Sequence, residues 1–136
     1  MNRIFIDTSF IIALYNIDDE YHKKAVNILP EIENAQFILT HAIILEIGNA
    51  FANIKLRKIG IEILKRLEAD KQNLIIPYSS EIHKQAMVLY ESRPDKNWGL
   101  TDCVSFVVMK KYGITKALTT DKHFQQAGFK ALLLES

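Results

Sequence analysis

The sequence predicts an α/β protein in which about five parallel strands form one sheet with helices packed on both of its faces. Short apolar runs alternate along the chain with longer segments of helical periodicity, which is typical of repeated β-α units. The short runs are apolar almost throughout, as expected of parallel strands that are buried on both faces. A length of 136 residues and an apolar content of 49% suit a single domain, which we expect to cover residues 1–136.

The order of the elements follows from these patterns. The predicted strands are residues 3–7, 36–40, 73–78, 116–120 and 129–134. The predicted helices are residues 9–16, 20–34, 42–56, 58–70, 80–92, 101–112 and 121–127. We expect Pro30 to break or kink the second helix, because proline lacks a backbone N–H and clashes with the preceding turn. Pro94 and Gly99 mark residues 93–99 as a loop.

Charge and cysteine content exclude several kinds of protein. Lys and Arg number 17 against 16 Asp and Glu, so the formal net charge of +1 indicates no partner by itself. Cys103 is the only cysteine, which excludes an internal disulfide and a C-x-x-C zinc or redox motif. No apolar run approaches the roughly 18 residues of a membrane span. We therefore expect a cytoplasmic protein without a membrane partner.

Four carboxylates lie where a solvated acid is not expected. Asp7 ends one predicted buried strand, and Asp121 directly follows another. Asp102 lies in the first turn of a helix that is apolar almost all round, and Glu46 lies in another apolar helical segment. Because functional side chains gather at the carboxyl ends of parallel strands, we expect these four to lie toward one edge of the sheet.

Each of these acids also has an ordinary explanation. Asp7 and Asp121 could cap helices, Asp102 could interact with a helix dipole, and Glu46 could face water. Together they favour a shared site, since two carboxylates about 4 Å apart repel by roughly 4 kcal/mol at an effective dielectric constant of 20. An all-oxygen cluster without cysteine or a histidine pair selects a hard ion such as Mg²⁺ or Mn²⁺. Such ions serve phosphodiester hydrolysis.

The segments around these acids resemble one known family. They read IDTS at 6–9, LE at 45–46, WGLTDCVSF at 98–106 and LTTDKHF at 118–124. In order and spacing they are similar to the motifs of PIN-domain ribonucleases, and the resemblance spans nearly the whole chain. It implies a three-layer α/β/α sandwich and an endoribonuclease that depends on Mg²⁺ or Mn²⁺.

The resemblance also implies roles for individual residues. Asp7, Glu46, Asp102 and Asp121 would be the catalytic and metal-binding acids, with Asp7 and Asp102 as shared ligands of the main ion. Ser9 and Thr101 would place hydroxyls beside these ligands, where each either contacts a metal-bound water or caps its helix. A chain with little beyond one such domain resembles VapC-type toxins. The expected partners are then an RNA substrate, a small antitoxin protein and a second copy of the chain.

Several alternatives stay open at this point. The chain could be a catalytically silent RNA- or protein-binding module of this fold, or a stand-alone RNA-processing nuclease without an antitoxin. A phosphoacceptor-aspartate protein fits less well, because a phosphohydrolase of that kind needs D-x-D where this chain has Asp7-Thr8-Ser9. His123 follows Asp121 by two residues, and we expect it to pack or face solvent since hard-ion sites seldom use imidazole. We expect Cys103 to be an inert core residue.

Overall fold

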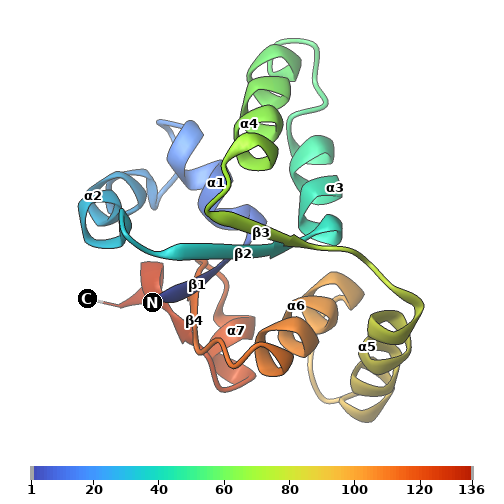
Figure 1. The fold of residues 1–136 in the computed structure, drawn as a ribbon. Helices are drawn as coiled ribbons and strands as arrows, with labels where there is room; N and C mark the ends of the chain where they lie inside the picture. Colours follow the sequence, from blue (N-terminus) through green and yellow to red (C-terminus); the bar gives the residue numbers. More distant parts are fainter. Residues whose placement is uncertain (1, 136) are drawn as a thin grey trace.

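A computed structural model describes residues 2–135 of the chain. All five strands are parallel and lie in the order β3-β2-β1-β4-β5 (Figure 1). The strands are β1 (Arg3–Ile6), β2 (Gln36–Thr40), β3 (Asn73–Ile76), β4 (Lys116–Leu118) and β5 (Lys130–Ala131). The predicted α/β class with a five-stranded parallel sheet is confirmed.

The helices form two layers on opposite faces of this sheet. The helices are α1 (Thr8–Tyr15), α2 (His22–Ile32), α3 (His41–Ala50), α4 (Arg57–Ala69), α5 (Ser80–Ser92), α6 (Leu100–Lys111) and α7 (Lys122–Gln126). Figure 1 shows α1 to α4 on one face and α5 to α7 on the other. Among residues 2–135, no helix combines the length and the apolar character needed to traverse a lipid bilayer.

The direction in which successive strands are added changes at the middle of the sheet. From β1 the chain moves outward to β2 and β3 through helices on one face, and then returns to β4 and β5 through helices on the other. The strand order therefore reverses between β1 and β4. In doubly wound sheets, ligands bind outside the carboxyl ends of the strands at this reversal.

The core is built from the central strands and from α6. Phe5, Ile38 and Leu118 on three neighbouring strands are fully buried. Helix α6 buries most of its surface, including Val108 and the free Cys103, as its nearly all-apolar sequence predicts. Burying one such aliphatic or aromatic side chain stabilises the fold by about 1.5–3 kcal/mol. Packing in this core holds the ends of β1 and β4 in place.

Two predicted elements are shorter than expected, and side chains take up backbone hydrogen bonds in the segments that follow them. Residues 129–134 form only the two-residue β5 followed by a 3₁₀ helix, Leu132–Leu134, and the Lys24 ammonium donates to the carbonyls of Leu133 and Glu135. The helix predicted at 42–56 ends at Ala50. There the Asn53 side chain accepts the Lys55 N–H, and the Arg57 guanidinium takes the carbonyl of Ala52.

The remaining differences concern boundaries. Helix α2 continues through Pro30 to Ile32, so the expected break is wrong: Pro30 stands in the last turn, where few helical hydrogen bonds depend on it. Strands 3–7, 73–78 and 116–120 each end earlier than predicted, where the chain leaves the sheet. Residues 93–99 connect α5 to α6 as expected.

Candidate active site

The end of β1 and the end of β4 lie side by side where the strand order reverses. Ile6 is in register with Leu118, and the Asp7 N–H donates to the Leu118 carbonyl at 3.1 Å, which extends the strand pairing by one residue. Asp7 is thereby held against the segment that leads from β4 to Asp121. Asp102 comes to the same place from the first turn of α6, and Glu46 from the middle of α3. The four predicted acids thus approach one another from four segments of the chain.

Asp7 is the most buried of the four carboxylates, with 8% of its surface exposed. Its Oδ2 accepts hydrogen bonds from the Ser9 hydroxyl at 2.6 Å and the Thr119 hydroxyl at 2.8 Å. Within residues 2–135 no hydrogen bond reaches Oδ1, which leaves that oxygen available to a ligand. Although Asp7 occupies the N-cap position of α1, its side chain does not cap the helix. Helix capping therefore does not explain the presence of Asp7 at this position.

The surroundings of Asp7 disfavour its ionised form. Burial raises the pKa of Asp7 to about 6, even though the hydrogen bonds from Ser9 and Thr119 lower it. The negative charges of Asp102 and Glu46 are smaller contributions to the same rise. A buried carboxylate among like charges is costly in its ionised form unless a cation neutralises it.

Ser9 and Thr119 tie the two strand ends into one unit. The Ser9 hydroxyl accepts the Thr120 N–H at 3.0 Å, and the Thr119 hydroxyl accepts the Asp121 N–H at 3.0 Å. Their two oxygens lie 3.2 Å apart. Ser9 was singled out in the sequence, but Thr119 was missed. Its place at a buried strand end, two residues before an acid, was the available signal.

Glu46 projects from α3 and is held by threonines. The Thr8 hydroxyl donates to Glu46 Oε1 at 2.9 Å. Burial raises the pKa of Glu46, the hydrogen bonds from Thr8 and Thr101 lower it, and the charges of Asp102 and Asp121 raise it. Thr101 therefore places its side chain beside Glu46, while Thr8 is a second contact that the sequence analysis missed.

Asp102 and Asp121 cap helices and also belong to the cluster. Asp102 Oδ2 accepts the Gly99 N–H at 3.0 Å, and Asp121 Oδ1 accepts the His123 N–H at 2.8 Å. Each cap uses one carboxylate oxygen, so the capping explanation and the site explanation are both compatible with these residues. Burial raises the pKa of Asp102; the Gly99 hydrogen bond lowers it, the Asp121 charge raises it and His123 lowers it.

His123 lies inside the cluster, so the expected packing or surface role is wrong. Its Nδ1 is 3.3 Å from Asp102 Oδ2 and 3.2 Å from Asp121 Oδ1. The turn in which Asp121 accepts the His123 N–H returns the imidazole toward that carboxylate. The two-residue spacing was therefore the signal that would have placed this ring in the site.

The donor set fits a divalent cation. One ligand atom each from Asp102, Asp121 and His123 lies within 4.8 Å of the other two. Asp7 and Glu46 add carboxylates whose pKa values are raised by burial and by their acidic neighbours. Carboxylate oxygens are the ligands that Mg²⁺ and Mn²⁺ prefer in proteins.

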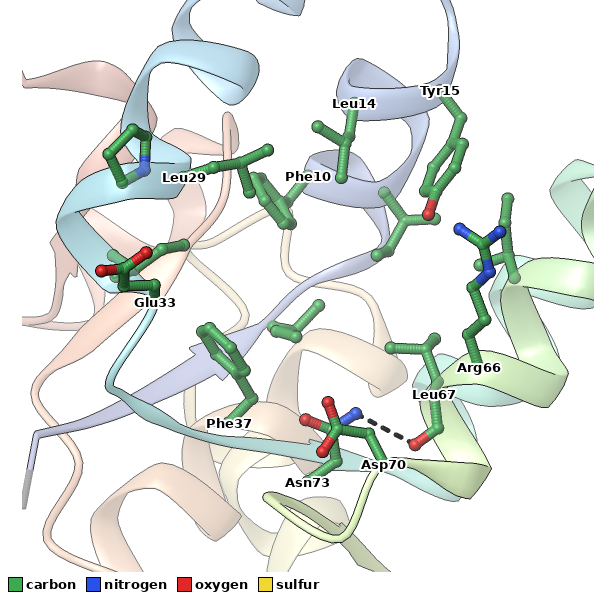
Figure 2. A pocket seen from close by; sticks show the side chains of 15 residues that line it. Phe10, Leu14, Tyr15, Leu29, Glu33, Phe37, Arg66, Leu67, Asp70 and Asn73 are labelled. Atoms are coloured by element: carbon green, nitrogen blue, oxygen red, sulfur yellow. Dashed lines mark hydrogen bonds between the residues drawn. The ribbon is translucent and has the colours of Figure 1, made fainter.

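Two hollows near the sheet differ in chemistry. A mainly apolar cavity of about 530 Å³ lies between α1, α2 and α4. Figure 2 shows Phe10, Leu29, Phe37 and Leu67 facing one another across it. None of the four acids lines it, and the Asn73 amide at its edge already donates to the Leu67 carbonyl. The charged residues that line this cavity, Glu33, Arg66 and Asp70, are separate from the four predicted acids. A second, more polar hollow adjoins the acids; its lining residues are Ser9, Tyr21, Thr120, Asp121, Lys122, Gln125 and Leu134.

Comparisons with known proteins find a family model and relatives that match most of the chain. The family model of the PIN domain matches residues 4–130. The chain is 26% identical over 129 residues to the 23S rRNA-specific endonuclease VapC20 of Mycobacterium tuberculosis, covering 93% of this chain and 95% of that protein.

Two solved structures share the fold. The crystal structure of Mycobacterium tuberculosis VapC20, described as a sarcin-ricin loop cleaving toxin, has a TM-score of 0.83 at 22% identity and covers 93% of this chain and 95% of its own. The crystal structure of FitAcB from Neisseria gonorrhoeae has a TM-score of 0.65 at 20% identity and covers 94% of each chain.

Proposed function

This chain belongs to the PIN-domain family, and on that premise we propose that it is a metal-dependent endoribonuclease that acts as the toxin of a toxin–antitoxin pair. The observation that carries the proposal is the convergence of Asp7, Glu46, Asp102 and Asp121 beside the reversal in strand order. The curated relative, an rRNA-specific endonuclease that aligns over most of both chains, supports the nuclease activity and the RNA substrate.

The four acids are the catalytic groups of this proposal and hold Mg²⁺ or Mn²⁺. Asp7 and Asp102 are the main ligands, and Glu46 and Asp121 complete the site. Oxygen donors and raised carboxyl pKa values support this assignment, because a bound cation offsets the repulsion among the acids. When bound, the ion lowers the pKa of a coordinated water and stabilises charge on the phosphate and the leaving oxygen.

The chain's own residues hold the acids ready for this task. Ser9 and Thr119 both bind Asp7 Oδ2, so the carboxylate is fixed in orientation with Oδ1 open. Thr8 holds Glu46, and the Gly99 N–H holds Asp102. Pre-set ligand positions of this kind lower the cost of ordering the site when substrate binds.

The polar hollow beside the acids is a suitable path for the RNA. It shares Ser9 and Asp121 with the cluster, and it adds the exposed Lys122 and the partly buried Tyr21. A lysine can pair with a backbone phosphate, and an aromatic ring can stack on a base. This hollow supports RNA as the substrate despite the near-zero net charge.

The proposal includes two protein partners and a location. A small antitoxin is supported by the description of the VapC20 structure as a toxin. A homodimer is supported by the exposed apolar side chains of Leu45 and Ile54, on α3 and in the segment after it. The protein acts in the cytoplasm, where its RNA substrate and its antitoxin are present.

The direct test is cleavage of labelled RNA and DNA by the purified protein in Mg²⁺, in Mn²⁺ and in excess EDTA. We expect RNA cleavage with either ion and none in the chelator. Asp7→Asn should abolish cleavage, whereas Glu62→Gln, on the exposed face of α4, serves as the matched control. Cleavage that persists in EDTA, in a preparation whose Asp7→Asn form is inactive, contradicts metal dependence. RNA binding without cleavage would instead indicate a silent binding module.

A further inference from the structure

The imidazole of His123 is placed among the acids by the structure around it. Asp121 accepts the His123 backbone N–H at 2.8 Å, which turns the ring toward the Asp121 carboxylate. The next residue, Phe124, is fully buried, and its ring centroid lies 5.0 Å from that of Phe106 and 6.2 Å from that of Phe5. Because Phe124 anchors α7 in the core, the neighbouring ring is held at the site.

The spacing of His123 from two acids is that of neighbouring metal ligands. Nδ1 is 3.3 Å from Asp102 Oδ2 and 3.2 Å from Asp121 Oδ1. In octahedral coordination with bonds of about 2.1 Å, adjacent ligand atoms lie roughly 3 Å apart. These two oxygens also accept the Gly99 and His123 N–H groups, and each keeps a second lone pair that can bind an ion. The nitrogen and the two oxygens can therefore bind one ion with only small displacements.

We propose that His123 is a nitrogen ligand of the bound cation, so that the site is a mixed nitrogen and oxygen site rather than an all-oxygen one. This rests on the proposed function in that it concerns the same cation site. Mg²⁺ favours oxygen donors and water, whereas imidazole favours first-row transition ions. His123 thereby shifts the selectivity of the site from Mg²⁺ toward Mn²⁺.

The competing interpretation is a hydrogen-bonded clamp. If Nδ1 carries a proton, it donates to the Asp102 and Asp121 carboxylates and holds them together without touching an ion. Both arrangements place Nδ1 between the same two oxygens, but only the ligand arrangement puts nitrogen in the coordination sphere. A spectroscopic measurement on the bound metal therefore separates them.

The experiment is pulsed electron paramagnetic resonance of Mn²⁺ bound to the metal-free protein labelled with ¹⁵N-histidine, without RNA. We expect a ¹⁵N hyperfine coupling in the wild type and in His83→Gln, a control histidine on α5 that contacts Tyr78 instead of the acids. The coupling should disappear in His123→Gln. Absence of the coupling in the wild type overturns the proposal and needs no variant to fold.

Calorimetric titration with each metal alone provides a second measurement. We expect His123→Gln to raise the Kd for Mn²⁺ at least about tenfold, since loss of even an outer-shell partner of a metal ligand costs about that much. The Kd for Mg²⁺ should stay within about threefold. Equal losses for both ions would contradict a nitrogen ligand.

These readouts keep the two proposals apart. Nitrogen-coordinated Mn²⁺ in a protein that cuts no RNA refutes the nuclease and retains the ligand. RNA cleavage with no nitrogen coupling refutes the ligand and retains the nuclease.

Discussion

Thr119 Oγ1 donates a 2.8 Å hydrogen bond to Asp7 Oδ2 across 112 residues of sequence, joining the ends of two adjacent parallel strands. The same hydroxyl accepts the Asp121 N–H. One threonine thus orients a buried carboxylate and the backbone that carries a second one.

We therefore expect Thr119→Val, which keeps the side-chain shape, to weaken metal binding about tenfold, because Asp7 loses a partner that orients it. The unpaired Asp121 N–H should also destabilise the fold by about 1–2 kcal/mol. Mn²⁺ titrations and chemical unfolding measure the two effects. Thr120→Val is the matched control, because Thr120 contributes its backbone N–H, which the substitution retains. Equal metal affinities of the two variants would refute the role of Thr119.

The Asp102→Asn variant separates catalysis from fold. The amide oxygen can still accept the Gly99 N–H, so the helix cap is retained while one negative charge leaves the cluster. In EDTA the variant should be at least as stable as the wild type. The loss of one repelling charge should raise its free energy of unfolding by up to about 1–2 kcal/mol after solvent screening. It should lose most RNA cleavage and most of the increase in melting temperature that Mg²⁺ produces, since that increase reports binding to the folded state.

Thermal melts with and without Mg²⁺ and one cleavage time course test this expectation. Asp102→Ala is the comparison that removes the charge and the cap together, and it should be less stable than Asp102→Asn. A destabilised Asp102→Asn protein that still cleaves RNA would show that Asp102 only caps its helix.

Asp7 should make the metal-free protein less stable as pH rises. Its pKa is about 6 in the folded protein and 3.8 ordinarily, so the folded state binds the proton more tightly than the unfolded state. Protonation of Asp7 therefore stabilises the fold, by about 3 kcal/mol at most. This stabilisation is complete below pH 3.8 and is lost as the pH rises through 6. The raised pKa values of Glu46 and Asp102 act in the same direction.

Urea unfolding in EDTA at several pH values between 4 and 7 measures this dependence. The difference between the wild type and Asp7→Asn isolates the contribution of Asp7 from that of other titrating groups. We expect the variant to gain stability relative to the wild type as pH increases. A constant difference across this range would be inconsistent with the raised pKa.

The exposed apolar surface of α3 and the following segment should form the homodimer interface. Leu45 is 67% exposed and Ile54 is 93% exposed, so docking of a second copy would remove these large aliphatic side chains from water. Light scattering at tens of micromolar protein should give the mass of a dimer, and Leu45→Glu should give a monomer. Val26→Glu, an exposed apolar position on α2, should leave the dimer intact. A wild-type monomer at this concentration would refute the homodimer.

The positions of Asp7, Asp102 and Asp121 in the site could be predicted because they depend on local and repetitive features. Each lies just after an apolar strand or in the first turn of an apolar helix, and parallel strands bring their carboxyl ends to the same edge. Glu46 was predictable as a charge on an otherwise apolar helical segment.

The contacts that orient these acids depended on the packed chain. Whether Thr8 and Thr119 point at a carboxylate, and whether His123 faces Asp102 instead of solvent, is set by the register of β1 against β4 and by the burial of Phe124. The segment after β5 is likewise held by Lys24, whose ammonium donates to the Leu133 and Glu135 carbonyls from more than a hundred residues away in sequence. The sequence by itself determined which segments form the sheet and which acids meet at its edge, since periodicity and strand direction are local properties. Only the tertiary structure decided which hydroxyls and which imidazole complete the site, because side-chain direction follows from long-range packing.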